Sequence, residues 1–307
     1  MIMEKVTVGD LKKLYIPDKS SHKGMNGKLT IIGGSRLFHG ASLWALKVAS
    51  RIVDMVFYAS TSENNQLTQK LKTQIFDFIA VPREEVEAYI EESDVILIGP
   101  GMIRAEGAEI SNFKFQISNL NNILNLKNEG AQTYYLTQYL LQRYPNKKWV
   151  IDAGSLQMME PVWLKWLNGN VIITPHRKEF ERLFSDAFHS GGAPSGHPRS
   201  VLTALLKKKA EKYGCTILLK GPTDIICSPG KCKIVEGGNP GMTKGGTGDV
   251  LAGLVASLAC KNDLFLAACA ASFINKKAGE ELAKKVGYYF NASDLADQIP
   301  KTLNHIL

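Results

Sequence analysis

Residues 237–253 read GGNPGMTKGGTGDVLAG, a glycine-rich turn that runs directly into an apolar helical pattern. Three of these glycines, Gly245, Gly246 and Gly248, precede a helix that we expect to begin near Asp249. Free backbone N–H groups at a helix N-terminus bind phosphate or another developing anion. The turn therefore predicts a site at which backbone amides, those of Gly246 and Gly248 included, hold negative charge.

Asp249 has two interpretations at this turn. As the N-cap of the helix it would only accept hydrogen bonds from backbone N–H groups. As a general base it would lie within reach of a hydroxyl group beside a bound phosphate. The GGTG run that precedes it favours the catalytic base.

Other nucleotide and hydrolase signatures are missing from the sequence. There is no GxxxxGK[ST] phosphate loop, and the dinucleotide pattern GxGxxG is broken by Leu251 at its third glycine. Neither HExxH nor GxSxG occurs, which argues against zinc proteases and hydrolases with a nucleophile elbow.

Apolar runs that end in glycine, proline or a polar residue alternate with helical patterns along the chain. Such alternation predicts an α/β fold with three layers, α/β/α, around a central and largely parallel sheet. Residues 224–236 instead predict a β-hairpin, and the chain turns helical from Asp249 to about Ala283. The predicted strands are 28–34, 55–60, 94–101, 149–154, 170–176 and 215–221, and the helices between them include 41–53, 132–143, 178–184 and 201–213.

The residues that carry chemistry fall at the carboxyl ends of these strands, where open parallel sheets bind their ligands. We expect one site to gather them. They are Gly33-Gly34, Gly99-Pro100-Gly101, Asp152, Thr174-Pro175-His176 and Lys220-Gly221.

Composition narrows the class of protein. The 307 residues are 45% apolar and 21% charged, which excludes wholesale disorder. The formal net charge is +8, but the basic residues are scattered, so a positive cleft for a small anion is favoured over nucleic-acid binding. We expect one domain over residues 1–307, with two surface loops at 104–130 and 185–200.

The N-terminus is too charged for a signal peptide, and no apolar stretch is long enough to span a membrane. The chain has five cysteines, an odd number, and no two of them have CxxC spacing. We therefore expect neither a zinc site nor a disulfide framework, which fits a protein of the reducing cytoplasm. Cys227 and Cys232 flank a turn, and we expect them to be unpaired thiols.

The motifs of the chain, taken in their order along the sequence, resemble those of the ribokinase-like superfamily. Within that superfamily they are most similar to those of the NAD(P)H-hydrate dehydratases. The resemblance runs from about Lys23 to Pro300. Its segments are KGMNGKLTIIGGS (23–35), GA (40–41), IGPG (98–101), IDAGSL (151–156), ITPHRKEFERL (173–183), LLKGPTDII (218–226), GNPGMTKGGTGDVLAG (238–253) and NASDL (291–295).

The resemblance implies a cofactor-repair enzyme. Such enzymes act on NADHX and NADPHX, whose nicotinamide ring has been hydrated, and phosphorylate the ring hydroxyl of the S epimer with ADP or ATP. Elimination of phosphate then restores NADH or NADPH. Mg²⁺ on the nucleotide phosphates is implied, and we expect ADP as the donor.

The family's residue roles transfer onto matching positions of this chain. Asp249 would be the base, with Gly246 and Gly248 holding the transferred charge. Ala41, Gly101, His176 and Asp249 would contact the damaged cofactor. Asp152 would either cap the following turn or order Mg²⁺ through water. The nucleotide would be bound by Lys220, Gly221, Pro222, Thr223, Asp224 and Gly248.

The chain departs from the family pattern at several positions. Ile103 stands in place of the last glycine of GPGxG, and Gly154 in place of a second aspartate. Ile274-Asn275 replaces a histidine-glycine pair, and Lys244 adds a positive charge before the glycines. No epimerase domain is expected, so the enzyme would depend on a separate epimerase; a homo-oligomer is also expected.

Two other functions remain open from the sequence. One is a vitamin-precursor or sugar kinase of the same superfamily, since the TPH and KGPTD segments are partly shared. The other is a non-catalytic nucleotide-binding protein, against which the intact Asp249 and its glycine run argue.

Overall fold

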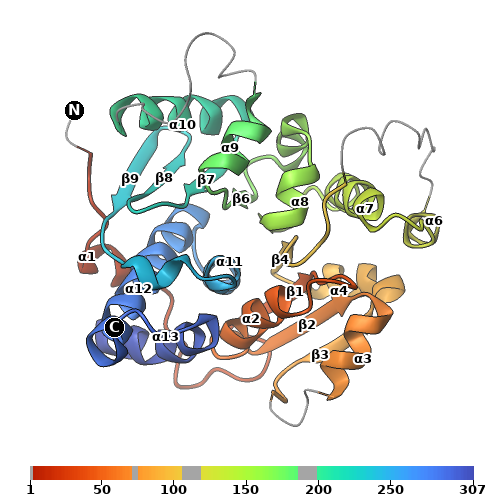
Figure 1. The fold of residues 1–307 in the computed structure, drawn as a ribbon, viewed down its shortest axis with the longest axis horizontal. Helices are drawn as coiled ribbons and strands as arrows, with labels where there is room; N and C mark the ends of the chain where they lie inside the picture. Colours follow the sequence, from red (N-terminus) through yellow and green to blue (C-terminus); the bar gives the residue numbers. More distant parts are fainter. Residues whose placement is uncertain (1–2, 71–74, 106–118, 186–198) are drawn as a thin grey trace.

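The computed structural model describes residues 3–70, 75–105, 119–185 and 199–307 (Figure 1). Its centre is one nine-stranded sheet in the order β3-β2-β1-β4-β5-β6-β7-β8-β9. The strands are β1 (Lys28–Ile32), β2 (Met55–Ser60), β3 (Ile79–Pro82), β4 (Val95–Ile98), β5 (Lys148–Ile151), β6 (Val171–Ile173), β7 (Thr216–Leu219), β8 (Asp224–Ser228) and β9 (Lys231–Val235).

The sheet is parallel from β3 to β7, and the hairpin of β8 and β9 adds two antiparallel strands at one edge. Central strands are buried on both faces, so neighbouring residues point into different cores. In β4, Val95 and Leu97 pack into one core, whereas Ile96 and Ile98 pack into the other. This two-sided burial explains the continuous apolar runs of the sequence.

Helices cover both faces and complete the predicted three layers. One face carries α2 (Gly40–Ala49), α11 (Thr247–Ala259), α12 (Leu264–Val286) and α13 (Ala292–Ile306), which Figure 1 shows gathered on one side of the sheet. The other face carries α4 (Val86–Glu92), α6 (Leu120–Leu124), α7 (Glu129–Arg143), α8 (Ala153–Met158), α9 (Arg177–Leu183) and α10 (Arg199–Tyr213).

The short helix α1 (Val8–Leu11) packs against α12, and α3 (Ser62–Lys70) packs beside β2 and β3 at the sheet edge. Three 3-10 helices, η2 (Arg83–Glu85), η3 (Pro161–Leu167) and η6 (Pro240–Thr243), lie in the connections. Within the described residues, no helix is both long enough and apolar enough to cross a membrane.

Several predictions of local structure need correction. The strand β3 and the helix α4 were not predicted. The helix predicted over residues 41–53 is α2, which ends at Ala49 rather than Val53. Part of the loop expected at 104–130 is helical, since α6 and the start of α7 lie there; residues 106–118 of that loop and 186–198 of the second loop lie outside the described residues.

The two cysteines of the hairpin are not the unpaired thiols that we expected. Cys227 and Cys232 are directly opposite residues of β8 and β9, with Cα atoms 4.2 Å apart, and they form a disulfide. The tight turn at Pro229-Gly230 brings the two strands into this register. Three cysteines, Cys215, Cys260 and Cys269, are free and buried.

The glycine-rich turn is held in place because α11 packs very closely on α2. A Cβ atom at Gly253 would lie 2.6 Å from the carbonyl oxygen of Ala45 and 2.8 Å from a Val48 methyl group. Both distances are shorter than real contacts, so only glycine fits without moving a helix. The close approach fixes the start of α11 against the sheet.

We therefore expect Gly253→Ala to lower the free energy of unfolding by about 1–3 kcal/mol, as overpacked cores do. Denaturant unfolding followed by circular dichroism measures this change. Gly9→Ala is the control, since a Cβ there would lie 3.5 Å from Thr7 Oγ1, in ordinary contact. Equal stability of the two variants would contradict the packing argument.

Candidate functional site

The glycine-rich turn forms the N-terminus of α11, as the sequence predicts. Gly246 is the N-cap, with φ of 93°, a left-handed conformation that favours glycine. A Cβ at Gly246 would also lie 2.3 Å from the Trp44 ring. The Thr247 hydroxyl ties the turn together by donating to the carbonyl oxygens of Met242 and Lys244, at 2.7 and 2.9 Å.

Asp249 lies in the first turn of α11 and not at its N-cap, so the capping interpretation is wrong. Burial raises the pKa of Asp249 from 3.8 to about 7, and repulsion from Asp152 adds to this effect. The positive charge of Lys220 opposes the shift, and Glu179 adds a smaller upward contribution. A carboxyl group that titrates near neutrality is suited to take up and release a proton.

Asp152, Thr174 and Lys220 meet where β5, β6 and β7 end. Asp152 Oδ1 accepts hydrogen bonds from the Thr174 hydroxyl and the Lys220 ammonium, both at 2.8 Å. Asp152 stands at the N-cap of α8, but its side chain forms no capping hydrogen bond. The side-chain cap that we considered for Asp152 is therefore wrong, and its carboxylate fixes Lys220 beside Asp249 instead.

His176 begins α9 as its N-cap, and its Nδ1 accepts a hydrogen bond from the Glu179 backbone N–H at 3.2 Å. The backbone N–H of His176 in turn donates to a carboxylate oxygen of Glu179 at 2.8 Å, which completes a capping box. The His176 side chain is 52% exposed. Nδ1 is thus used structurally, Nε2 lies 3.6 Å from Glu179 Oε1, and His176 also lines the cavity described next.

A cavity of about 750 Å³ opens beside the glycine-rich turn, a volume within the range of small-molecule sites. Apolar side chains, Leu251 and Met242 among them, share its lining with backbone from the glycine turns. The predicted nucleotide loop contributes Lys220, Gly221, Pro222 and Asp224, and the remaining lining residues include His176, Asn239, Thr247, Gly248, Asn275 and Lys276.

Two members of the predicted nucleotide set have structural partners. Asp224 is buried; its carboxylate accepts from the Gly221 N–H at 2.8 Å and the Ser272 hydroxyl at 2.7 Å. Thr223 is not among the residues that line this cavity, and its hydroxyl accepts a hydrogen bond from Arg199 at 3.0 Å. The Asp224 carboxylate therefore stabilises the conformation of loop 220–224 through these hydrogen bonds.

Lys276 was missed by the sequence reasoning. Its buried ammonium lies 3.4 Å from Asp224 and donates to the carbonyl oxygens of Gly221 and Pro222 at 2.9 and 3.1 Å. It holds the loop against α12. Asn275, noticed only as a departure from the family pattern, lines the same cavity, and its buried Oδ1 has no hydrogen-bond partner among the described residues.

Lys244 does not face the cavity. Its ammonium donates to the Tyr288 carbonyl oxygen and lies 5.3 Å from the centre of the Phe290 ring. The positive charge that the sequence places before the glycines therefore fastens the turn to the connection before α13.

Ala41 and Gly101 are brought together at the other side of the turn. A Cβ at Gly101 would lie 3.2 Å from the Ala41 Cβ and 3.2 Å from the Gly34 Cα. The Gly34 N–H donates to the Pro100 carbonyl oxygen at 2.7 Å. The loops after β1 and β4 are thus packed tightly against each other beside Ala41, with Gly34 and Gly101 themselves buried.

The residues present fit a magnesium ion only in part. Within the described ranges, no cluster of three or more His, Cys, Asp or Glu side chains is placed to hold a metal. Asp152 Oδ1 is already engaged by Lys220 and Thr174. Mg²⁺ prefers phosphate oxygens and water, so donor phosphates would supply most of its ligands, with the Asp152 carboxylate nearby.

Known proteins match this chain over nearly its whole length. The family model for NAD(P)H-hydrate dehydratase matches residues 29–301. A bifunctional NAD(P)H-hydrate repair enzyme from Methanocaldococcus jannaschii is 36% identical over 96% of this chain and 52% of its own length. An ADP-dependent (S)-NAD(P)H-hydrate dehydratase from Nitrosopumilus maritimus is 33% identical over 94% of this chain and 93% of its own length.

The chain therefore spans about half the length of the bifunctional relatives and nearly all of the Nitrosopumilus one. Solved structures show the fold. A ribokinase-like superfamily protein from Enterococcus faecalis has a TM-score of 0.77 at 21% identity, covering 99% of this chain and 96% of its own. A Bacillus subtilis structure titled an ADP/ATP-dependent NAD(P)H-hydrate dehydratase co-crystallised with ATP/Mg²⁺ has a TM-score of 0.77 at 23% identity, with full coverage of both chains. The predicted ribokinase-like fold is confirmed.

The raised pKa of Asp249 predicts a pH-dependent stability. The shift from 3.8 to about 7 corresponds to about 4 kcal/mol at most. The folded state binds this proton more tightly than the unfolded state. The free energy of unfolding therefore falls as the pH rises from about 4 through 7 and the carboxyl ionises. We expect Asp249→Asn to be more stable than the wild type at pH 8, with the difference vanishing at pH 4.

Denaturant unfolding of both proteins at several pH values measures this difference. The control is Asp297→Asn, since Asp297 is an exposed partner of Lys47 and Arg51. Asp297 is preferred to Asp294, because Asp294 belongs to the capping box of α13. A stability difference between wild type and Asp249→Asn that does not depend on pH would contradict the raised pKa.

Proposed function

Because the chain belongs to the NAD(P)H-hydrate dehydratase family, we propose that it is an ADP-dependent dehydratase that returns the S epimers of NADHX and NADPHX to NADH and NADPH. The observation that carries this proposal is the position of Asp249. It is a carboxyl group with a pKa of about 7 in the first turn of a helix whose glycine N-terminus is built to hold an anion.

Hydroxide is a poor leaving group, and phosphate is a much better one. In the first step, Asp249 accepts the proton of the ring hydroxyl while that oxygen attacks the terminal phosphorus of ADP. The bond from this phosphorus to the bridging oxygen breaks, and AMP leaves. The amides at Gly246 and Gly248 stabilise the charge on the transferred group, an effect worth about 3–4 kcal/mol per donor in other enzymes.

In the second step, the lone pair of the ring nitrogen expels phosphate by breaking the carbon–oxygen bond. The neighbouring ring carbon then loses a proton, and the electron pair of its carbon–hydrogen bond forms the ring double bond. Phosphate and NADH or NADPH are the products, so the net change is loss of water coupled to conversion of ADP to AMP and phosphate. Mg²⁺, when bound to the donor, would neutralise the phosphate charge.

The donor is assigned to the 750 Å³ cavity. Its loop, residues 220–224, would contact the adenosine-phosphate portion, with Gly248 at the phosphate end. The damaged ring would lie between Ala41 and Gly101 on one side and His176 on the other. His176 supports this arrangement because it lines the donor cavity and forms a backbone bridge with Lys220, the partner of Asp152.

The biological setting is part of the proposal. We place the enzyme in the cytoplasm with residues 1–307 as one domain, working with an epimerase activity that supplies the S epimer, and assembled as a homo-oligomer. ADP is preferred over ATP as the donor, which the name of the Nitrosopumilus relative supports.

The decisive assay mixes the purified protein with NADHX and Mg²⁺ and follows NADH absorbance with ADP or ATP. We expect a rise that depends on the nucleotide and is faster with ADP. A flat trace with both donors, using NADHX that an authentic dehydratase consumes, would overturn the proposal. Phosphorylation of a vitamin precursor or a sugar would then identify the kinase alternative.

Asp249→Asn should lower kcat by about 10²–10⁴ while ADP binding is retained. The wild-type rate should fall as the pH drops through about 7, because the base becomes protonated there. Steady-state kinetics from pH 5.5 to 9, with calorimetry for ADP, tests both points. A variant that keeps its rate would remove Asp249 from the mechanism.

A further inference from the structure

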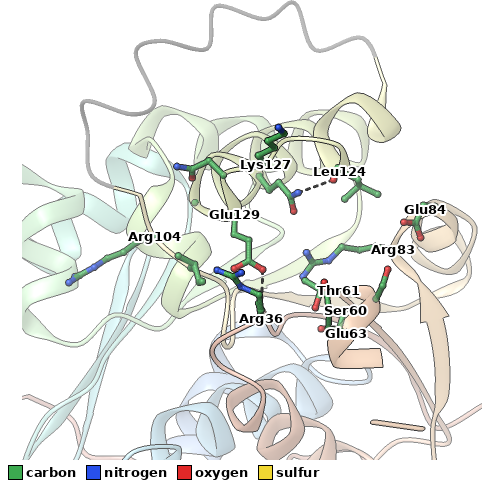
Figure 2. Close-up of a pocket in the computed structure, with 15 residues that line it drawn as sticks. Arg36, Ser60, Thr61, Glu63, Arg83, Glu84, Arg104, Leu124, Lys127 and Glu129 are labelled. Carbon is green, nitrogen blue, oxygen red and sulfur yellow. Dashed lines mark hydrogen bonds between the residues drawn. The ribbon is translucent and has the colours of Figure 1, made fainter. Parts of the chain in front are cut away.

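A second cavity, of about 570 Å³, opens between α3, η2 and the start of α7 (Figure 2). It shares no lining residue with the donor cavity. Its walls are polar and come from the ends of β1, β2 and β4. The lining residues include Arg36, Ser60, Thr61, Glu63, Arg83, Glu84, Ile103, Arg104, Lys127, Asn128 and Glu129.

Arg83 is the centre of this cavity. Its side chain is buried, with the residue only 6% exposed, and Figure 2 shows its guanidinium pointing from η2 into the cavity. Nη2 donates to the carbonyl oxygens of Gly33 and Gly34 at 3.0 and 3.1 Å. Nε is buried and has no hydrogen-bond partner among the described residues.

Arg83 therefore carries a buried charge that Glu129 and Glu84 stabilise electrostatically, without a carboxylate within 4.0 Å of it among the described residues. Burial lowers the pKa of the Arg83 guanidinium, which means that its positive form is poorly solvated here. A bound anion would restore the lost solvation. Among the described residues, Arg83, Arg36 and Lys127 form no ion pair with a carboxylate within 4.0 Å, so their charges remain available.

The cavity also contains groups that accept hydrogen bonds. Glu63, Glu84 and Glu129 are part of its lining, and Glu129 Oε1 accepts a hydrogen bond from the Arg36 backbone N–H at 3.0 Å. A bare anion would be repelled by three carboxylates. A phosphorylated sugar fits better, because its phosphate can meet the arginines while its hydroxyls donate to the carboxylates.

The cavity adjoins the backbone surface proposed for the damaged cofactor. The carbonyl groups that Arg83 binds belong to Gly33 and Gly34, and Gly34 in turn binds Pro100 and packs against Gly101. The Gly33–Gly34 backbone thus connects the Ala41 and Gly101 contact with Arg83. The volume suits one half of a dinucleotide.

We propose that this cavity binds the phosphorylated adenosine half of the hydrated dinucleotide, while the phosphoryl donor occupies the other cavity. The proposal rests on the proposed function. It assigns Arg36, Arg83 and Lys127 to substrate binding at a distance from the reacting ring.

The test uses the double variant Arg36→Ala with Lys127→Ala, because both side chains are exposed and their loss leaves the core intact. We expect KM for NADHX to rise about tenfold with kcat and KM for ADP unchanged, the pattern for contacts made equally in the ground and transition states. Lys301→Ala, an exposed lysine on α13, is the matched control and should change nothing.

A truncated substrate locates the lost contact. Hydrated reduced nicotinamide mononucleotide lacks the adenosine half, so the wild type and the double variant should use it with equal kcat/KM. An equal loss on the truncated and full-length substrates would overturn the proposal, as would an unchanged KM for NADHX.

Binding without turnover separates this proposal from the proposed function. NADPH fluorescence reports binding directly, and we expect its Kd to rise about tenfold in the double variant. If authentic NADHX is not turned over, the proposed function fails, and this titration alone decides whether the cavity binds a dinucleotide. Equal Kd values for the wild type and the double variant would overturn the cavity assignment.

Discussion

The buried ion pair between Asp152 and Lys220 is the constraint on which the site depends. It joins the ends of β5 and β7, and the Thr174 hydroxyl at the end of β6 donates to the same carboxylate oxygen. Removing one partner of such a pair leaves a buried charge and costs about 3–5 kcal/mol. The pair also fixes the field at Asp249, since Asp152 raises the pKa of Asp249 and Lys220 lowers it. The same contact therefore holds three strand ends together and adjusts the pKa of the proposed base, which burial raises most.

Close packing of small residues supplies the second constraint. Asp249 reaches this field only because α11 starts where Gly246 lies against Trp44 and Gly253 lies against Ala45. On the far side, Gly34 and Gly101 bring the loops after β1 and β4 into contact beside Ala41. Side chains at these positions would separate the helix from the loops. The glycines thus matter less as flexible points than as places where two pieces of backbone must touch.

Most of the fold and much of the site follow from the sequence. Buried parallel strands produce continuous apolar runs, and their ends are marked by glycine or a polar residue, so β1, β4, β5, β6 and β7 could be predicted together with Asp249, Lys220 and His176. The edge strand β3 is short and half exposed, so it leaves a weak pattern. Lys276 and Arg83 could not be predicted, because a lone basic residue gives no sign of burial, and both donate to backbone carbonyl oxygens that no sequence pattern marks. The disulfide depends on the register of a hairpin, which the cysteine spacing left undecided.

The two cavities explain why a kinase-like fold suits a dehydration. Phosphorylating a ring hydroxyl requires two phosphorylated ligands to approach each other at one turn without exchanging places. The donor cavity combines apolar side chains with a backbone loop braced by Asp224 and Lys276, whereas the second cavity is lined by arginine, lysine and glutamate side chains (Figure 2). Under the proposals above, their different chemistry would distinguish a nucleotide held by its base and backbone from a sugar phosphate held by charge. Both cavities lie toward the carboxyl ends of the same parallel sheet, and the donor cavity reaches the N-terminus of α11 at Thr247 and Gly248, beside the proposed base Asp249.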